Sequence, residues 1–189
     1  DLQEALTAGL HDLLPQLQAV IAQDQVQEPE CGAITAQVRG VLADLAAKHP
    51  DKTWFGDSRT RIGDYRNLIV KPNREEACLA IHPNSPPHHA AEAPRCAAAL
   101  SKRVGKPVYL TLGAEGMALV TREKVRHIPT ARLEGKLDIV GAGDSATAGI
   151  VAALSAGGTL EEAAILGNLV ASITVQQLGT TGAATREQV

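Results

Sequence analysis

The stretch Gly141-Ala142-Gly143-Asp144 has residue types that could hold an anion and move a proton. Its glycines allow backbone N–H groups to turn toward one point, and the start of the following helix adds partial positive charge there. Such a turn can hold the negative charge of a phosphoryl group during its transfer. Asp144 falls in the first helical turn, where the helix dipole keeps a carboxylate ionised and able to accept a proton from a hydroxyl. This pattern is typical of kinase chemistry.

Two other interpretations of this stretch stay open from the residues alone. One is an ordinary glycine-rich turn in which Asp144 is a common N-terminal charge. The other is a dinucleotide-binding fingerprint, since residues 141–146 also fit G-x-G-x-x-[G/A]. That fingerprint requires a second strand ending in an acidic residue about twenty positions further on, whereas residues 159–178 have the pattern of a helix. The sequence also lacks G-x-x-x-x-G-K-[ST], so any nucleotide would bind without a P-loop.

Two helices are expected to position this stretch. One is rich in small residues and runs from Asp144 to the glycine pair at 157–158. Thr159 and Glu162 then have the spacing of a capping box, which predicts the start of the second helix. The second helix has four large apolar residues on one face: Leu166, Leu169, Val170 and Ile173.

Upstream, short apolar strands alternate with helical segments. Apolar spacing, prolines and glycines predict helices over residues 2–14, 33–48, 74–80 and 95–104. Strands are predicted over residues 19–24, 53–59, 68–70 and 108–112, followed by a hairpin-like pair at 117–121 and 125–128. This alternation predicts an α/β protein in which a mostly parallel sheet lies between two layers of helices.

Composition excludes several classes of function. The chain has 189 residues, and its 18 basic and 21 acidic residues nearly balance, which argues against partners such as nucleic acid or a membrane surface. With only 2% aromatic residues, base-stacking platforms are not expected either. No apolar run approaches the roughly 20 residues of a spanning helix. Cys31, Cys78 and Cys96 show no C-x-x-C spacing, which indicates free thiols in a reducing compartment, the cytoplasm.

Four motifs, in order along the chain, resemble those of the ribokinase-like (PfkB) carbohydrate kinase family. Residues 138–144, Asp-Ile-Val-Gly-Ala-Gly-Asp, resemble the family signature D-T-x-G-A-G-D. Residues 111–116 are similar to its nucleotide loop T-L-G-x-x-G, and residues 71–77 to its K-P-N-x-x-E segment. Asn168 matches an asparagine on the adenine side of the family's site. The four motifs together are more specific than any one of them.

The resemblance implies transfer of the γ-phosphate of ATP to a hydroxyl of a sugar or sugar-like substrate. Asp144 would be the base that deprotonates this hydroxyl, and the amides of residues 141–143 would form the anion hole. The nucleotide would be bound by residues of the other motifs: Asn73, Thr111, Gly113, Ala114, Glu115, Gly116 and Asn168.

The resemblance also implies two cations. Glu76 would act at the magnesium-phosphate side through a bridging water. Many relatives bind a monovalent cation near the anion hole, and K⁺ would here be held by the carboxylate of Asp138 and the carbonyls of Val140, Thr174, Gln177 and Gly179. Ile139 stands where threonine is usual and Ala183 where a polar residue is usual, so the sequence departs from the family at this cation site.

Each of these motifs also has a structural interpretation. Asn73 with Glu76 is a capping pair in its own right. The turn at 113–116 could simply join two strands, and Asn168 could be an ordinary polar helix position. His82, His88 and His89 lie among prolines, without an acid or cysteine at ligand spacing, and are interpreted as residues of a surface loop from His82 to Pro94.

Residues 1–189 are predicted to form a single catalytic domain from a longer kinase. Family members carry a further N-terminal part with sugar-binding residues and a β lid, and residues 1–24 look like the helix and strand that follow it. Asp57-Ser58-Arg59, with Tyr65-Arg66 and Lys71-Pro72-Asn73, looks most like the heptose-phosphate kinase branch. The alternatives are a non-catalytic ribokinase-like binding or regulatory domain, and a nucleoside or vitamin-precursor kinase. Relatives often dimerise through the lid, so a homodimer is a further expectation.

Overall fold

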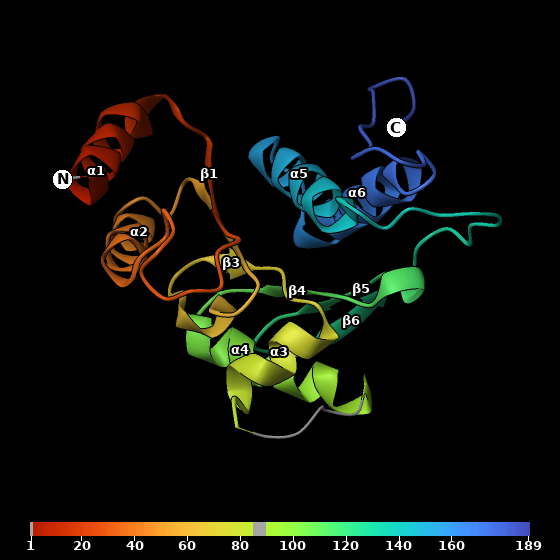
Figure 1. Ribbon diagram of the computed structural model, residues 1–189, viewed down its shortest axis with the longest axis horizontal. Helices are drawn as coiled ribbons and strands as arrows, with labels where there is room; N and C mark the ends of the chain where they lie inside the picture. Colours follow the sequence, from red (N-terminus) through yellow and green to blue (C-terminus); the bar gives the residue numbers. More distant parts are fainter. Residues whose placement is uncertain (1, 85–89) are drawn as a thin grey trace. The chain divides into compact units, whose positions relative to one another are not determined.

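The computed structural model describes residues 2–84 and 90–189 (Figure 1). His88 and His89 of the predicted loop lie outside the described residues. At the other end of that loop, helix α4 begins at Ala93, earlier than predicted, because Pro94 fits the first turn of a helix, where its missing N–H has no intrahelical partner to lose.

Every predicted helix and strand is present among the described residues. The helices are α1 (Leu2–Leu13), α2 (Ala36–Lys48), α3 (Arg74–Ile81), α4 (Ala93–Val104), α5 (Ala142–Ser155) and α6 (Leu160–Thr174). The strands are β1 (Ala19–Asp24), β2 (Thr53–Ser58), β3 (Ile69–Val70), β4 (Val108–Thr111), β5 (Met117–Val120) and β6 (Val125–Ile128). Short 3-10 turns complete the order: η1 (Leu14–Gln16), η2 (Ile62–Asp64), η3 (Ala90–Glu92) and η4 (Gly113–Glu115).

The strands form one sheet in the order β1-β2-β3-β4-β5-β6. The first four strands are parallel, and β1 pairs with β2 along its whole length, from Ala19 opposite Thr53 to Asp24 opposite Ser58. The connections β4–β5 and β5–β6 are too short for a crossover, so these strands run antiparallel. The parallel register brings the carboxyl ends of β1 and β2 together.

The described chain separates into two compact units, residues 1–110 with 120–125, and residues 111–119 with 126–189. The core of the first unit is built around buried aromatic rings. Phe55 and Tyr109 stack with their ring centroids 6.4 Å apart. Tyr65 packs on Gly56, where an added Cβ would lie 3.0 Å from the ring, and its hydroxyl donates to the Ala22 carbonyl at 3.2 Å. The glycine in β2 therefore makes room for a tyrosine that ties β1 to β2.

In the second unit, α5 and α6 pack side by side through small residues (Figure 1). A Cβ added to Gly149 would lie 2.9 Å from the Leu166 carbonyl oxygen, and one added to Gly167 would lie 2.7 Å from Ile150 Cγ1. The capping box of Thr159 and Glu162 is present as predicted.

The apolar face of α6 is not its most buried face. Leu169 is 36% exposed, and Leu166, Val170 and Ile173 are only half-buried. The buried residues are mostly small ones on other positions: Ala163, Ala164, Gly167, Asn168, Ser172 and Thr174. Close approach to α5 selects for small side chains, so size and not hydropathy decides which face is buried.

The sequence predicts free thiols and no membrane-spanning helix. Cys31, Cys78 and Cys96 are free, the first exposed and the other two buried, as predicted. Burial and a hydrogen bond with Cys96 raise the pKa of the Cys78 thiol to about 12. In the part of the chain that the structure describes, the helices are too short or too polar to cross a bilayer.

Candidate functional site

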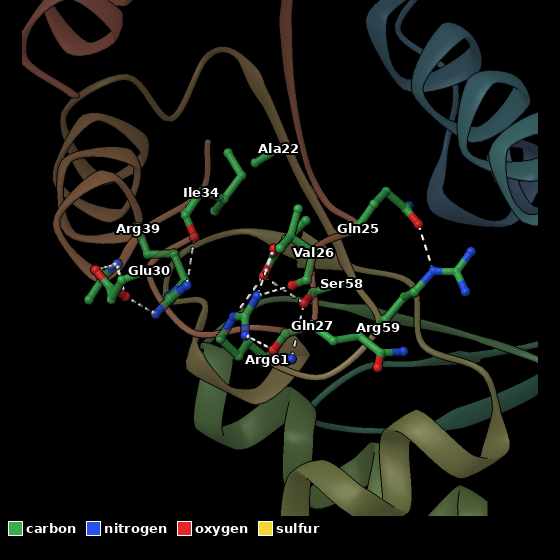
Figure 2. Close-up of polar contacts among 12 residues, drawn as sticks. Ala22, Gln25, Val26, Gln27, Glu30, Ile34, Arg39, Ser58, Arg59 and Arg61 are labelled. Atoms are coloured by element: carbon green, nitrogen blue, oxygen red, sulfur yellow. Dashed lines mark hydrogen bonds and ion pairs between the residues drawn. The ribbon is translucent and has the colours of Figure 1, made fainter. Parts of the chain in front are cut away.

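A buried ion pair joins the carboxyl ends of β1 and β2. Asp24 is 3% exposed and closes β1. The guanidinium of Arg61 meets its carboxylate in a fork, with Nε to Oδ2 and Nη2 to Oδ1 both at 3.0 Å, and the Ser58 hydroxyl donates to Oδ2 at 2.9 Å (Figure 2). The hydrogen bond with Asp24 raises the pKa of Arg61. This pair keeps both charges hydrogen-bonded where the two strands end.

Arg61 also fixes the loop that follows β1. It donates to the carbonyls of Val26 and Gln27, the latter at 2.8 Å. Arg59, two residues earlier, is directed away from this cluster, and its Nε donates to Gln25 Oε1 at 2.8 Å (Figure 2). Two arginines therefore follow the predicted strand end: Arg61 is held by hydrogen bonds within the fold, and Arg59 lies at the surface. The spacing of residues did not reveal the role of Arg61, since Asp24 lies 37 positions away.

A second buried ion pair lies at the carboxyl end of β2 and β3. Lys71 Nζ is 2.9 Å from Asp57 Oδ2, and the side chains are 5% and 12% exposed. The Lys71 backbone N–H donates to the Gly56 carbonyl at 3.3 Å, which places the lysine beside β2. The ends of parallel strands are where ligands collect in open α/β sheets, and this pair fixes a lysine ammonium beside an aspartate carboxylate there.

Asn73 and Glu76 form a complete capping box at the start of α3. Asn73 Oδ1 accepts from the Glu76 backbone N–H, and Glu76 Oε2 accepts from the Asn73 backbone N–H, both at 2.8 Å. Burial raises the pKa of Glu76, and Asp57 adds to the rise while Lys71 and Arg59 oppose it. The capping interpretation is confirmed, and Glu76 also lies within electrostatic reach of the strand-end charges; its role at magnesium stays a prediction.

The side chains of the first unit could hold magnesium only together with the phosphates of a bound substrate. Among the described residues no cluster of three or more His, Cys, Asp or Glu side chains could hold a metal. Magnesium keeps several waters and is commonly bound through one or two carboxylates together with substrate phosphates. Glu76 could supply such a carboxylate through water, since its Oε2 is used by the capping box and Oε1 lies outside it.

The predicted nucleotide loop forms a tight turn in the second unit. The Leu112 N–H donates to the Gly116 carbonyl at 2.8 Å, and the Gly116 N–H donates to the Gly113 carbonyl at 3.0 Å. Both glycines have positive φ, +64° at Gly113 and +91° at Gly116, a region that favours glycine. His127 Nε2 lies 2.7 Å from the Glu115 carbonyl oxygen and must carry the hydrogen, because a carbonyl only accepts. Ala114 and Glu115 thus belong to a hydrogen-bonded turn, and Thr111 ends the strand before it.

The stretch 141–144 forms the start of α5. Gly141 has φ +79°, a backbone conformation that favours glycine. The Ala142 N–H donates to the Ile139 carbonyl at 3.1 Å, which amends the predicted anion hole by occupying one of its three amides. Asp144 is exposed in the first helical turn. Residues 129–140, between β6 and this stretch, form no strand, and Ile139 is 78% exposed.

Asp138 braces this stretch against the segment after α6. Its backbone N–H donates to the Val175 carbonyl at 2.8 Å. One carboxylate oxygen accepts from the Val140 N–H and the other from the Gly179 N–H, both at 3.1 Å. Of the residues predicted for a monovalent cation, Asp138, Val140 and Gly179 therefore lie together, and both carboxylate oxygens already accept backbone N–H groups.

The side chain of Asn168 is engaged with backbone. It is 6% exposed, and its Nδ2 donates to the Ile128 carbonyl at 2.9 Å and to the Pro129 carbonyl at 3.3 Å. On α5, the Thr147 hydroxyl is buried without a hydrogen-bond partner among the described residues. The sequence did not indicate the contacts of Asn168 or the burial of Thr147, because both depend on which segments pack against the helices.

The structure thus gathers the predicted residues in two places. In the first unit, Asn73 and Glu76 lie with the strand-end charges Asp57 and Lys71. The second unit holds the predicted nucleotide loop, the α5 stretch with Asp138 and Val140, and Asn168.

Comparison with known proteins adds a family match. A model of the pfkB family of carbohydrate kinases matches residues 56–186. The bifunctional protein HldE of Caulobacter vibrioides is 33% identical over 183 residues, covering 93% of this chain and 36% of the relative. HldE of Azorhizobium caulinodans is 34% identical over 152 residues, covering 75% of this chain and 31% of the relative. The chain spans about a third of the length of these relatives.

Solved structures share the fold. Escherichia coli phosphofructokinase-2 in complex with potassium matches with a TM-score of 0.75 at 18% identity, over 96% of this chain and 59% of that one. Arabidopsis thaliana ribokinase complexed with ribose and ATP matches with a TM-score of 0.65 at 22% identity, over 85% and 51%. Thermotoga maritima ribokinase gives a TM-score of 0.66 at 23% identity, over 89% and 54%. The predicted fold class, three-layer α/β/α with a mostly parallel sheet, is confirmed.

Proposed function

Because the chain belongs to the pfkB family of carbohydrate kinases, we propose that it transfers the γ-phosphate of ATP to a hydroxyl of a sugar or sugar phosphate. The observation that carries this proposal is the exposed carboxylate of Asp144 in the first turn of α5, directly after the left-handed glycine Gly141. The relatives named HldE and the heptose-phosphate kinase resemblance of residues 57–73 favour a sugar phosphate as the acceptor. Use of ATP would place the reaction in the cytoplasm.

In the proposed step, the acceptor hydroxyl oxygen bonds to the γ-phosphorus while the bond to the bridging oxygen of ADP breaks. The hydroxyl proton passes to the Asp144 carboxylate. The N–H groups of Gly141 and Gly143, which donate to no carbonyl among the described residues, would face the charge on the transferred group. Ala142 supports the turn instead, through its bond to Ile139.

The remaining predicted residues would hold the nucleotide and its cations. The turn at 113–116 would contact the phosphates and ribose, with Asn73 and Glu76 at the magnesium side. When bound, magnesium would neutralise phosphate charge, a general requirement of this chemistry. Potassium is part of the proposal too, since each Asp138 oxygen keeps lone pairs beside its amide bond. The potassium in the phosphofructokinase-2 structure supports looking for one here.

The test is Asp144→Asn in the intact protein, with Glu161→Gln as its matched control. Glu161 is also a first-turn acid, at the start of α6, and pairs with Arg126 at the surface. We expect Asp144→Asn to reduce kcat by about 10³-fold or more, the scale of a lost general base, with ATP affinity retained. Glu161→Gln should stay within a few-fold of wild type. Asp144→Asn turnover near that of the control would remove Asp144 from its role.

The acceptor panel for this assay should contain sugars, sugar phosphates and nucleosides. Phosphorylation of nucleosides alone would favour the nucleoside-kinase alternative. ATP binding by titration calorimetry without turnover on any acceptor would favour the binding or regulatory alternative.

A further inference from the structure

Asn168 contacts the end of β6 and not an open surface. Its side-chain amide nitrogen has two hydrogens, and the carbonyls of Ile128 and Pro129 lie within hydrogen-bond distance of that nitrogen. Carbonyls only accept, so the amide nitrogen and not the oxygen must face them. Asn168 is 6% exposed, the bond to Ile128 is buried and that to Pro129 is partly buried, and together they fix where residues 128–129 lie.

The backbone that Asn168 fixes is in direct contact with the turn at 113–116. A Cβ added to Gly116 would lie 2.3 Å from the Ile128 carbonyl oxygen, 2.7 Å from the Thr130 nitrogen and 2.9 Å from the Pro129 carbonyl carbon. No side chain separates the two backbones at this point. A shift of residues 128–130 would therefore be transmitted to Gly116.

A second contact holds the same turn from β6. His127 Nε2 donates to the Glu115 carbonyl at 2.7 Å. On the other side of the turn, a Cβ added to Gly113 would meet nothing within 4 Å. The turn is thus held from the β6 side and open around Gly113.

We infer that Asn168 is a positioning residue for nucleotide binding, which sets the shape of the turn at 113–116 through the backbone of residues 128–130. The inference rests on the proposed function, since it takes this turn to be the nucleotide loop. It assigns Asn168 an indirect role in place of the adenine contact expected from the family motif. The residue supplies affinity for ATP without taking part in the transfer step.

The test compares Asn168→Asp with Ser172→Ala in the intact protein. Aspartate has nearly the same shape as asparagine but no N–H donors, so both bonds to residues 128 and 129 are lost. Ser172 is a matched control because it is buried one turn later on α6 and its hydroxyl donates to the Leu169 carbonyl inside the helix, at 2.7 Å. Ser172→Ala removes a buried bond without touching β6.

Two measurements are made on both variants. Hydrogen exchange of the Leu112 and Gly116 amides, read at urea concentrations that give the variants equal free energies of unfolding, reports the shape of the turn. Steady-state kinetics report KM for ATP and kcat separately. We expect Asn168→Asp to speed exchange of both amides and to raise KM for ATP by about tenfold, because part of the free energy lost with the two hydrogen bonds is felt at the turn. The expected kcat stays within about threefold, and Ser172→Ala changes none of these quantities.

Equal exchange rates in Asn168→Asp and Ser172→Ala would overturn the inference, as would faster exchange with an unchanged KM. If Asn168→Asp does not fold, Asn168→Ser retains one donor and is expected to give a smaller change in the same direction. Wild-type protein that binds no ATP in calorimetry would instead refute the proposed function. A wild type that binds ATP and an Asn168→Asp variant with equal affinity would refute this inference alone.

Discussion

Gly149 of α5 faces Gly167 of α6, and a Cβ added to Gly149 would lie 3.0 Å from the Gly167 Cα. The two backbones therefore meet where neither residue has a side chain. This contact holds α5, whose first turn carries Asp144, against α6.

Gly149→Ala is expected to destabilise the protein by about 2 kcal/mol, because an added methyl at this crossing forces the helices apart. The change occurs although alanine is the better helix former by about 1 kcal/mol. Gly40→Ala is the control, since Gly40 lies in α2 with nothing within 4 Å of an added Cβ, and it should stabilise by up to about 1 kcal/mol. Urea denaturation measures the free energy of unfolding of both variants. If both substitutions stabilise or both destabilise the protein, the close crossing of α5 and α6 is contradicted.

Arg61→Lys is expected to destabilise the protein by about 2 kcal/mol although the charge is kept. Lysine cannot reproduce the two-nitrogen contact with Asp24 together with the bonds to the Val26 and Gln27 carbonyls. Arg59→Lys, whose side chain reaches only Gln25, should stay within about 0.5 kcal/mol of wild type. Thermal and urea unfolding compare the two, and a loss at position 59 equal to that at position 61 would show that the fork geometry adds nothing.

Stability is expected to fall with rising pH just above 4.5, the ordinary pKa of glutamate, through Glu76. Burial raises its pKa in the folded protein, so between the ordinary and the raised value the folded state binds more protons than the unfolded chain. Glu76→Gln keeps an acceptor for the Asn73 N–H and removes this titration. As the pH rises through that window, the free energy of unfolding of Glu76→Gln should therefore increase relative to that of wild type. A difference between the two that does not change with pH would contradict the raised pKa.

Thr147→Val is expected to stabilise the protein by about 1 kcal/mol. Valine has the same shape and removes a buried hydroxyl that has no partner among the described residues. Thr174→Val provides the contrast, because the equally buried Thr174 hydroxyl donates to the Ala171 carbonyl at 3.1 Å. The Thr174→Val variant should be less stable than wild type. If it is more stable, the hydrogen bond does not explain the difference in the effect of valine at positions 147 and 174.

Local signals explain why the helix starts could be predicted from the sequence. Thr159 and Glu162, like Asn73 and Glu76, are three residues apart and satisfy each other's backbone groups whatever packs around them. The left-handed turn at Gly141 is equally local, since it follows from the freedom of glycine. These features of the fold and of the candidate site needed no tertiary information.

Features that depend on packing partners could not be predicted in the same way. The fork between Asp24 and Arg61 joins residues 37 positions apart and requires the register that sets Asp24 opposite Ser58. The buried face of α6 depends on the close approach of α5, which hydropathy does not report. The Ala142 amide was free to bind an anion as far as the sequence indicated, and only the turn from Ile139 occupies it.

The brace at Asp138 has a consequence for how related sequences are interpreted. Its two oxygens each receive an N–H from the main chain, a task that an asparagine could not perform because one of its terminal atoms is itself a donor. The main chain alone therefore demands an acid at this position. The two backbone bonds account for an aspartate here without a cation, so this residue in a sequence is not by itself evidence of a bound cation.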